Sequence, residues 1–238
     1  NFAKLRGSYG TSGKDAGLYL LNSVFQGNPT IAGLGDFTLN FPKNDVPAYT
    51  IGNTIGNPDL KPELTTTYEF GADLGLFKNK VSLEYTYYHS IHDDQLVIIN
   101  LPRSTGYTQT TTNIGRMENK GHELALTLKP LQGVVEGLDF ELFGAYSQNR
   151  NEVITVTNDI DELVIGNFGF ASGTTVSIVA KEGLPFGTFK GNNFKYNDQG
   201  QVIVGADGFP VYPDADEYLG NNQADYLLNF GANINYKG

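Results

Sequence analysis

The feature that most constrains this chain is a repeated alternation of apolar and polar residues, broken by Gly, Pro, Asn or Asp. The clearest example runs from Tyr226 to Tyr236, where Tyr, Leu, Phe, Ala and Ile occupy every second position and Asn or Gly fills most of the positions between them. A period of two places successive side chains on opposite faces of a β-strand. The sequence therefore predicts an all-β chain whose strands have one apolar and one polar face.

Six segments carry this alternation. They cover Phe2 to Thr11, Thr65 to Phe77, Lys80 to Ile98, Thr112 to Lys129, Leu138 to Val156 and Asp225 to Lys237. Soluble sandwich strands also alternate when one face meets water, so periodicity alone leaves a soluble β-sandwich open.

Strand length and loop asymmetry favour a transmembrane β-barrel. Thr67 to Phe77 covers about 11 residues, which is the span of a tilted membrane strand and exceeds the usual strand length in globular proteins. Short connections, such as Lys78 to Lys80, alternate with long ones, such as Thr157 to Ala224. Barrels of this kind have short periplasmic turns and long extracellular loops. We therefore expect an antiparallel transmembrane barrel with lipids around its apolar face.

Composition excludes several other classes. No run of about 18 apolar residues predicts a transmembrane helix, and no cationic, apolar leader opens the chain. The chain has 0 Cys, which rules out disulfides and Cys-based metal or redox sites. A net charge of −10 without a basic cluster argues against nucleic acid as a partner.

Six strands cannot close a membrane barrel, because such barrels begin at about 8 strands and an open edge in lipid leaves backbone groups unpaired. We therefore expect the chain to be a fragment of a larger barrel, or to be completed by other chains.

The sequence gives only weak evidence for a metal site. His89 and His92 lie beside Asp93 and Asp94, but positions three apart on a strand face opposite ways. The acidic run at Asp214, Asp216 and Glu217 lacks the spacing and glycine of an EF-hand loop, so solvated charge is the better interpretation than a calcium site. No catalytic constellation emerges, and we expect no enzyme activity, no metal and no cofactor.

The polar faces of the strands supply candidate pore-lining residues. Glu69, Asp73, Glu84, Glu123, Asn229 and Asn233 are predicted to face the lumen.

The long connection from Thr157 to Ala224 is acidic and rich in aromatic residues, including Phe168, Phe170 and Phe194. Aromatic rings among Asn and Asp are typical of sugar or peptide recognition. Four aromatic residues in the long connections are candidate substrate-binding residues: Tyr107, Phe186, Phe189 and Tyr212. The same aromatics could instead pack the loop on itself or against a lid protein. Turns at Asn197 to Gly200 and Ala206 to Gly208 predict a short strand pair around Gln201 to Val204.

Several phrases of the sequence resemble the SusC/RagA family of TonB-dependent outer-membrane transporters, in the family's order. They are FAKLRGSYG (Phe2 to Gly10), GNPDLKPE (Gly56 to Glu63) followed by TTTYEFGAD, NIGRMENKGHE (Asn113 to Glu123), NRNEV (Asn149 to Val153), EGLPFGTFKG (Glu182 to Gly191) and the final strand from Gly220 to Gly238. Two positions depart from the pattern: Lys190 stands where Tyr is usual, and Asn222-Gln223-Ala224 replaces a Pro-centred entry to the last strand.

The resemblance implies that residues 1–238 belong to the barrel domain of a transporter with about 22 strands, whose plug domain and remaining strands lie outside this sequence. It implies a location in the outer membrane of a Gram-negative bacterium, a SusD-like surface lipoprotein as lid, and energy from the TonB-ExbB-ExbD complex. The implied function is import of oligosaccharides or oligopeptides, and the polar wall is implied to contact the plug first and the substrate second. Two alternatives stay open: a non-transporting surface protein, such as an adhesin or a secretion-machine barrel component, and a soluble glycan-binding module.

Overall fold

The computed structural model describes residues 1–26, 30–31, 37–38, 42, 44–47, 49–132, 134–157, 160–169 and 175–237. Six long strands dominate it: β1 (Phe2–Lys14), β7 (Glu63–Leu76), β8 (Val81–Asn100), β9 (Gln109–Leu128), β10 (Leu138–Thr155) and β15 (Leu227–Tyr236). The six strands expected from alternation are confirmed, with ends shifted by a few residues.

The six strands form one antiparallel sheet in the order β1-β7-β8-β9-β10-β15, and the short strand β6 (Thr54–Ile55) pairs in parallel with β9. The hairpin between β7 and β8 is tight because three consecutive residues, Phe77, Lys78 and Asn79, adopt left-handed backbone angles with φ of 53°, 58° and 65°. Sequence neighbours thus pair in space wherever the connection is short.

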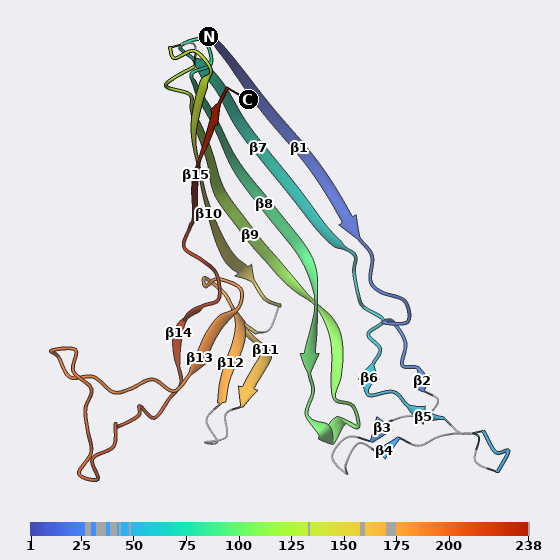
Figure 1. Cartoon of the computed structure of the whole chain (residues 1–238). Coiled ribbons are helices and arrows are strands. Elements are labelled where there is room, and N and C mark those ends of the chain that lie inside the picture. The colour runs from blue at the N-terminus through green and yellow to red at the C-terminus, as the bar shows by residue number, and fades with distance from the viewer. Residues whose placement is uncertain are drawn as a thin grey trace.

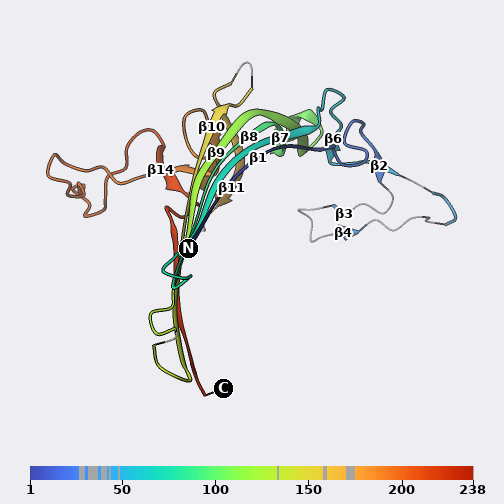
Figure 2. The same cartoon turned by 90° about the horizontal axis from the view of Figure 1, so that it is seen from above.

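The short turns and both termini lie at one end of the sheet, and the long connections lie at the other (Figure 1). Seen from above, the sheet is a single curved layer (Figure 2). Within the described residues it is open, since β1 and β15 each pair along one edge only. No helix in the described part of the chain is long and apolar enough to cross a membrane.

The long connection after β10 is more ordered than expected. It contains a four-stranded antiparallel sheet of β11 (Glu162–Gly169), β12 (Thr175–Lys181), β13 (Thr188–Gly191) and β14 (Glu217–Asn221). Its strands are short and a bulge between Val164 and Gly166 breaks the alternation of β11, which is why alternation did not reveal them. Asp159 and Phe170 lie outside the described residues.

The two expected turns in this connection are present. Asn197 N–H donates to Gln201 O at 2.9 Å, and Gly205 N–H donates to Phe209 O at 2.8 Å. The expected pair of strands is reduced to isolated bridges, Tyr196 with Val202 and Val204 with Pro210.

A small hydrophobic core joins the two sheets. Ile114, Val153, Val156 and Ala180 are buried in it, and Met117, Leu163, Ile165 and Phe186 are among the residues that pack against it. The core therefore attaches the four-stranded sheet to the long-loop end of β9 and β10.

Among its described residues, the connection between β1 and β7 contains short, two-residue strands. β2 (Phe25–Gln26) pairs with β5 (Thr50–Ile51), and β3 (Thr30–Ile31) pairs with β4 (Phe37–Thr38). A 3₁₀ turn, η1 (Arg103–Thr105), lies between β8 and β9.

Candidate functional site

The strand register divides the six-stranded sheet into two chemically different faces. Asp73 pairs with Glu84, Glu84 with Ala125, Ala125 with Ala145, and Ala145 with Asn229. Directly paired residues lie on the same face. All six residues predicted to face a lumen therefore share one surface, which we call the polar face: Glu69, Asp73, Glu84, Glu123, Asn229 and Asn233.

Arg6 is the cationic centre of the polar face. Its guanidinium lies 3.2 Å from Asp73 Oδ1 and donates to Thr86 Oγ1 at 3.0 Å, while Lys4 Nζ lies 3.7 Å from Asp73 Oδ2. The missing side chain at Gly71 makes this possible, because a Cβ there would lie 2.3 Å from Arg6 Nε. Sequence reasoning named the carboxylates of this wall and missed the arginine between them.

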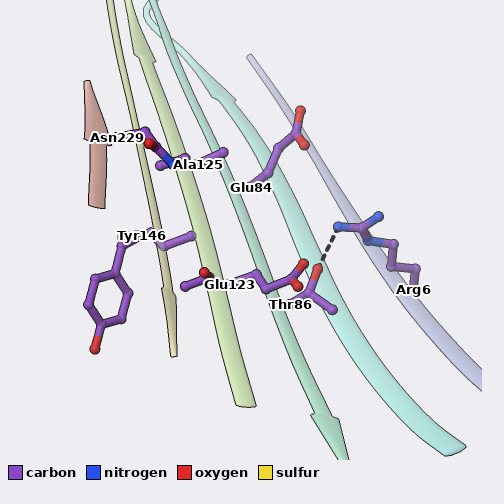
Figure 3. Close-up of a pocket in the computed structure, with 10 residues that line it drawn as sticks. Arg6, Glu84, Thr86, Glu123, Ala125, Tyr146 and Asn229 are labelled. Carbon is purple, nitrogen blue, oxygen red and sulfur yellow. Dashed lines mark hydrogen bonds between the residues drawn. The ribbon is translucent and has the colours of Figure 1, made fainter. Parts of the chain in front are cut away.

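Beside Arg6 lies a shallow hollow of about 350 Å³ that Glu84, Thr86, Glu123 and Asn229 help to line (Figure 3). In the close-up, the ring of Tyr146 points away from these groups. A surface of carboxylates, amides and a guanidinium can bind hydrogen-bonding groups.

The opposite, apolar face is strongly exposed in the isolated sheet. Phe230 is 84 % exposed and Leu5 is 83 % exposed, although both belong to regular strands. Contiguous apolar surface of this kind marks contact with a partner or with lipid.

An aromatic row bounds the apolar face toward the long loops, and we call it the aromatic belt. Its ring pairs are Tyr9 with Tyr68 at 5.1 Å between centroids, Tyr87 with His122 at 5.2 Å, and Tyr146 with Tyr226 at 6.0 Å. Aromatic girdles at this position are typical of membrane barrels, where the rings sit at headgroup level.

Beyond the belt, the same face turns charged. Lys120 Nζ lies 2.7 Å from Glu118, Arg116 Nε lies 2.7 Å from Asp93, and Arg150 Nη1 lies 3.1 Å from Asp225. The apolar band therefore ends at the belt, and the strands continue as a polar extension toward the long loops.

The four predicted substrate-binding aromatics are distributed over three places. Phe186 packs against the small core, and Phe189 lies in β13 between Ile178 and Gly220. Tyr212 is 53 % exposed and lies 5.6 Å from the Phe194 ring, in the connection between β13 and β14. Tyr107 lies in the connection between β8 and β9, which both views place apart from the β13–β14 connection (Figures 1 and 2).

The turn from Glu182 to Gly187 ties the four-stranded sheet to β10. Gly183 N–H donates to Val153 O at 2.8 Å, Val153 N–H donates to Leu184 O at 3.0 Å, and Val156 N–H donates to Glu182 Oε1 at 3.0 Å. Val153 is in register with Met117 and His92 on the polar face, and the side chain of Val153 belongs to the small core with Ala180 of β12, against which Met117 packs. The four-stranded sheet therefore covers the polar face at its long-loop end.

Lys190, where the resemblance expects Tyr, belongs to a polar cluster on the four-stranded sheet. Its Nζ donates to Glu162 Oε1 at 2.6 Å, and Tyr218 OH donates to Glu162 Oε2 at 2.5 Å. Burial opposes ionisation of Glu162, but the hydrogen bonds from Lys190 and Tyr218 prevail and hold its pKa below the ordinary range. The same hydrogen bond raises the pKa of Lys190.

The segment Asn57 to Glu63 is fastened to β8 and β9 by Asn113. Asn113 Oδ1 accepts from Lys61 N–H at 2.9 Å, and its Nδ2 donates to Lys61 O at 2.9 Å and to Asp94 O at 2.6 Å. Two of the sequence phrases that carry the family resemblance, GNPDLKPE and NIGRMENKGHE, therefore contact each other directly.

His89 and His92 lie on opposite faces, as the strand period requires: His89 pairs with Tyr68 on the apolar face, and His92 with Thr65 on the polar face. No group of three or more potential metal ligands occurs among the described residues.

Comparison with known proteins agrees with this architecture. The family model described as "TonB dependent receptor-like, beta-barrel" matches residues 1–237. TonB-dependent receptor P39 of Formosa agariphila is 28% identical over 233 residues, covering 96% of this chain and 20% of the relative. TonB-dependent receptor SusC of Bacteroides thetaiotaomicron is 28% identical over 190 residues, covering 76% of this chain and 19% of SusC.

Among solved structures, the RagAB peptide transporter superposes with a TM-score of 0.73 at 23% identity, over 99% of this chain and 25% of that one. The chain thus spans about a fifth to a quarter of the length of these relatives. Its curved, two-faced sheet is part of an outer-membrane β-barrel, and the chain belongs to the TonB-dependent receptor family.

Proposed function

We propose that this chain forms part of the wall and outer vestibule of an active importer that carries oligosaccharides or oligopeptides across the outer membrane. The observation that carries the proposal is the four-stranded sheet seated on the polar face at the long-loop end, where Val153 and Gly183 join it to β10. In a membrane barrel the long loops are extracellular, so this sheet would stand over the mouth of the pore.

The polar face supports a hydrated path through the barrel. Arg6 and Asp73 give it fixed charges of both signs, and Glu84, Glu123 and Asn229 add carboxylate and amide groups around a hollow. Such groups bind the amides of a peptide, the hydroxyls of a sugar, or a plug domain packed inside the barrel. We assign the wall first to plug contact and second to substrate passage.

The aromatics in the long connections are the proposed substrate contacts. Tyr107, Phe186, Phe189 and Tyr212 would present apolar ring faces to the C–H faces of a sugar or to peptide side chains. Tyr212 supports this role best, because it is exposed and adjacent to the Phe194 ring.

The proposed partners follow from the family. TonB, ExbB and ExbD would supply energy through a part of the protein outside this sequence, and a SusD-like surface lipoprotein would close the vestibule as a lid. The relatives that carry the names SusC and RagAB motivate this assignment.

Deletion of the full-length gene tests import. The deletion strain should lose growth on at least one complex glycan or one peptide mixture as sole nutrient, and should fail to take up the fluorescently labelled form of that nutrient. The nutrient affected identifies the substrate class. Unchanged growth and uptake on every glycan and peptide mixture would overturn import, and loss of surface adhesion alone would favour the adhesin alternative.

A further inference from the structure

A chain of side-chain hydrogen bonds crosses the polar face above the aromatic belt and ends at the four-stranded sheet. Phe186 N–H donates to Asn151 Oδ1 at 2.7 Å, and Asn151 Nδ2 donates to Asn119 Oδ1 at 2.9 Å. Asn119 Nδ2 lies 2.9 Å from His92 Nε2, and His92 Nδ1 lies 3.0 Å from Thr65 Oγ1. We call these four side chains, Asn151, Asn119, His92 and Thr65, the amide relay.

The direction of the amide relay is set at its loop end. A backbone N–H can only donate, so Asn151 must present its oxygen to Phe186 and its NH₂ group to Asn119. Asn119 must then accept through its oxygen, which also receives Asn149 Nδ2 at 3.2 Å. The NH₂ group of Asn119 therefore points at His92 Nε2, and this nitrogen has to be the acceptor.

The relay accordingly holds His92 as a neutral ring with its proton on Nδ1, donated to Thr65. A second proton on Nε2 would place two donors face to face. Rotating the Asn119 amide to relieve that contact would set its NH₂ group against those of Asn149 and Asn151. Rotating Asn151 in turn would point its NH₂ group at the Phe186 N–H.

We propose that His92, Asn119 and Asn151 are positioning residues that couple the protonation of His92 to the docking of the Glu182–Gly187 turn, and with it the four-stranded sheet, on the barrel wall. Protonated His92 is compatible with the wall only when the Asn151 to Phe186 bond is released. The coupling does not depend on what the protein transports.

Charged groups near His92 affect its pKa, and with it the pH range over which the coupling acts. Glu63 of β7 lies on the same face as His92, and Asp93, the next residue of β8, lies on the opposite face; both carboxylates raise the pKa of His92. Each is paired, Glu63 with Lys14 at 3.5 Å and Asp93 with Arg116 at 2.7 Å. The neighbouring relay groups from β9 and β10 are the neutral amides of Asn119 and Asn151. Burial lowers the pKa of His92 below its ordinary value of 6.5, against the opposing effect of the two carboxylates.

The lowered pKa of His92 determines how docking changes with pH. Above 6.5 the ring is neutral whether or not the turn is docked, and docking is at full strength. As the pH falls below that value, the undocked state takes up a proton first, so docking weakens progressively through the lowered pKa of the docked state.

Hydrogen–deuterium exchange of the full-length protein in lipid nanodiscs tests the coupling. At each pH, the exchange rate of the peptide spanning Glu182 to Gly187 is compared with the rate of the same peptide when unstructured. The ratio of the two rates gives its protection. Between about pH 7.5 and pH 5.5, its protection should fall more than about twofold in the unmodified protein, with about tenfold as the upper limit set by an ordinary pKa of 6.5 in the undocked state. The His92→Gln variant, which has no titratable ring, should change less than about twofold.

Matched variants isolate the relay. His89→Gln lies on the opposite face and should keep the full response, and Glu182→Gln should keep it as well because its amide oxygen still accepts from Val156. Asn119→Leu severs His92 from Asn151 while leaving Asn151 bonded to Phe186, so it should lose the response and serves if His92→Gln does not fold. The proposal is overturned if the unmodified protein shows no pH response, or if His92→Gln or Asn119→Leu retains it.

Discussion

Tyr9 of β1 and Tyr68 of β7 lie side by side on the apolar face, with ring centroids 5.1 Å apart and ring planes tilted by 48°. On the long-loop side of this pair the same face continues with Thr11 and Thr66, and on the other side with Gly7 and Phe70. The pair therefore marks the boundary between the apolar band and the polar extension of the strands, where a membrane protein places tyrosines at the headgroups.

Direct coupling between these two tyrosines can be measured. A double-mutant cycle with Tyr9→Ala and Tyr68→Ala should give an interaction energy of about 0.5–1.5 kcal/mol, because tilted aromatic pairs stabilise beyond their buried area. The measurement is equilibrium unfolding of the full-length protein from lipid vesicles. Tyr9 of β1 and Tyr226, which directly precedes β15, lie at opposite edges of this sheet, and this pair is the control. A coupling near zero for Tyr9 and Tyr68 would contradict the packing.

The two-faced sheet makes a sharper prediction at neighbouring residues of β15. Phe230 is 84 % exposed on the apolar face, and Asn229 lies beside the hollow on the polar face. Phe230→Arg should destabilise the protein in vesicles by about 2–4 kcal/mol, because it puts a cation near the bilayer midplane. Asn229→Arg should cost much less, since water reaches that face. Equal costs at the two positions would show that the faces are wrongly assigned.

Alternation predicted the six-stranded sheet well because one physical rule governs it: every second side chain meets lipid. That rule also placed Glu69, Asp73 and Asn233 on a common face. It could not reveal β11 to β14, whose strands are short and interrupted by a bulge, and which are stabilised by a small core of residues distant in sequence, Val153 with Ala180 among them.

The side-chain hydrogen-bond networks could not be predicted from the sequence either. The role of Asn113 depends on which carbonyls lie near it after folding, and the direction of the relay through Asn119 depends on a backbone N–H contributed from Phe186. Gly71 gave a usable signal that was missed: a glycine inside an otherwise regular strand often marks a close approach, here by Arg6.

Asn113 should control the order of the segment that includes Lys61. Asn113→Ala removes the acceptor for Lys61 N–H and the donor to Lys61 O, which should cost about 1–3 kcal/mol locally. Hydrogen–deuterium exchange at Leu60 and Lys61 should therefore accelerate, while exchange in β7 stays unchanged. Asn235→Ala, on β15, which pairs with β10, is the control and should leave both regions as they were. Unaltered exchange at Lys61 in Asn113→Ala would exclude the clamp.

Acid should loosen the four-stranded sheet through Glu162. Its pKa is held below the ordinary value of 4.5 because the hydrogen bonds from Lys190 and Tyr218 outweigh the opposing effect of burial. The unfolded sheet therefore takes up the proton first as the pH falls, so the stabilisation is complete above 4.5 and is lost as the pH falls through the lowered value. Protection of β11 and β13 from hydrogen exchange, corrected for intrinsic rates, should drop over that range.

Substitution separates this effect from a general acid response. Glu162→Gln should start with weaker protection at neutral pH and show little further loss on acidification, because the amide carries no charge to form an ion pair with the Lys190 ammonium and does not titrate. Glu217→Gln changes a carboxylate whose partner is Asn193, at 2.9 Å, and should keep the acid response of the unmodified protein. A flat profile in Glu217→Gln, or a full acid response in Glu162→Gln, would assign the loosening to another group.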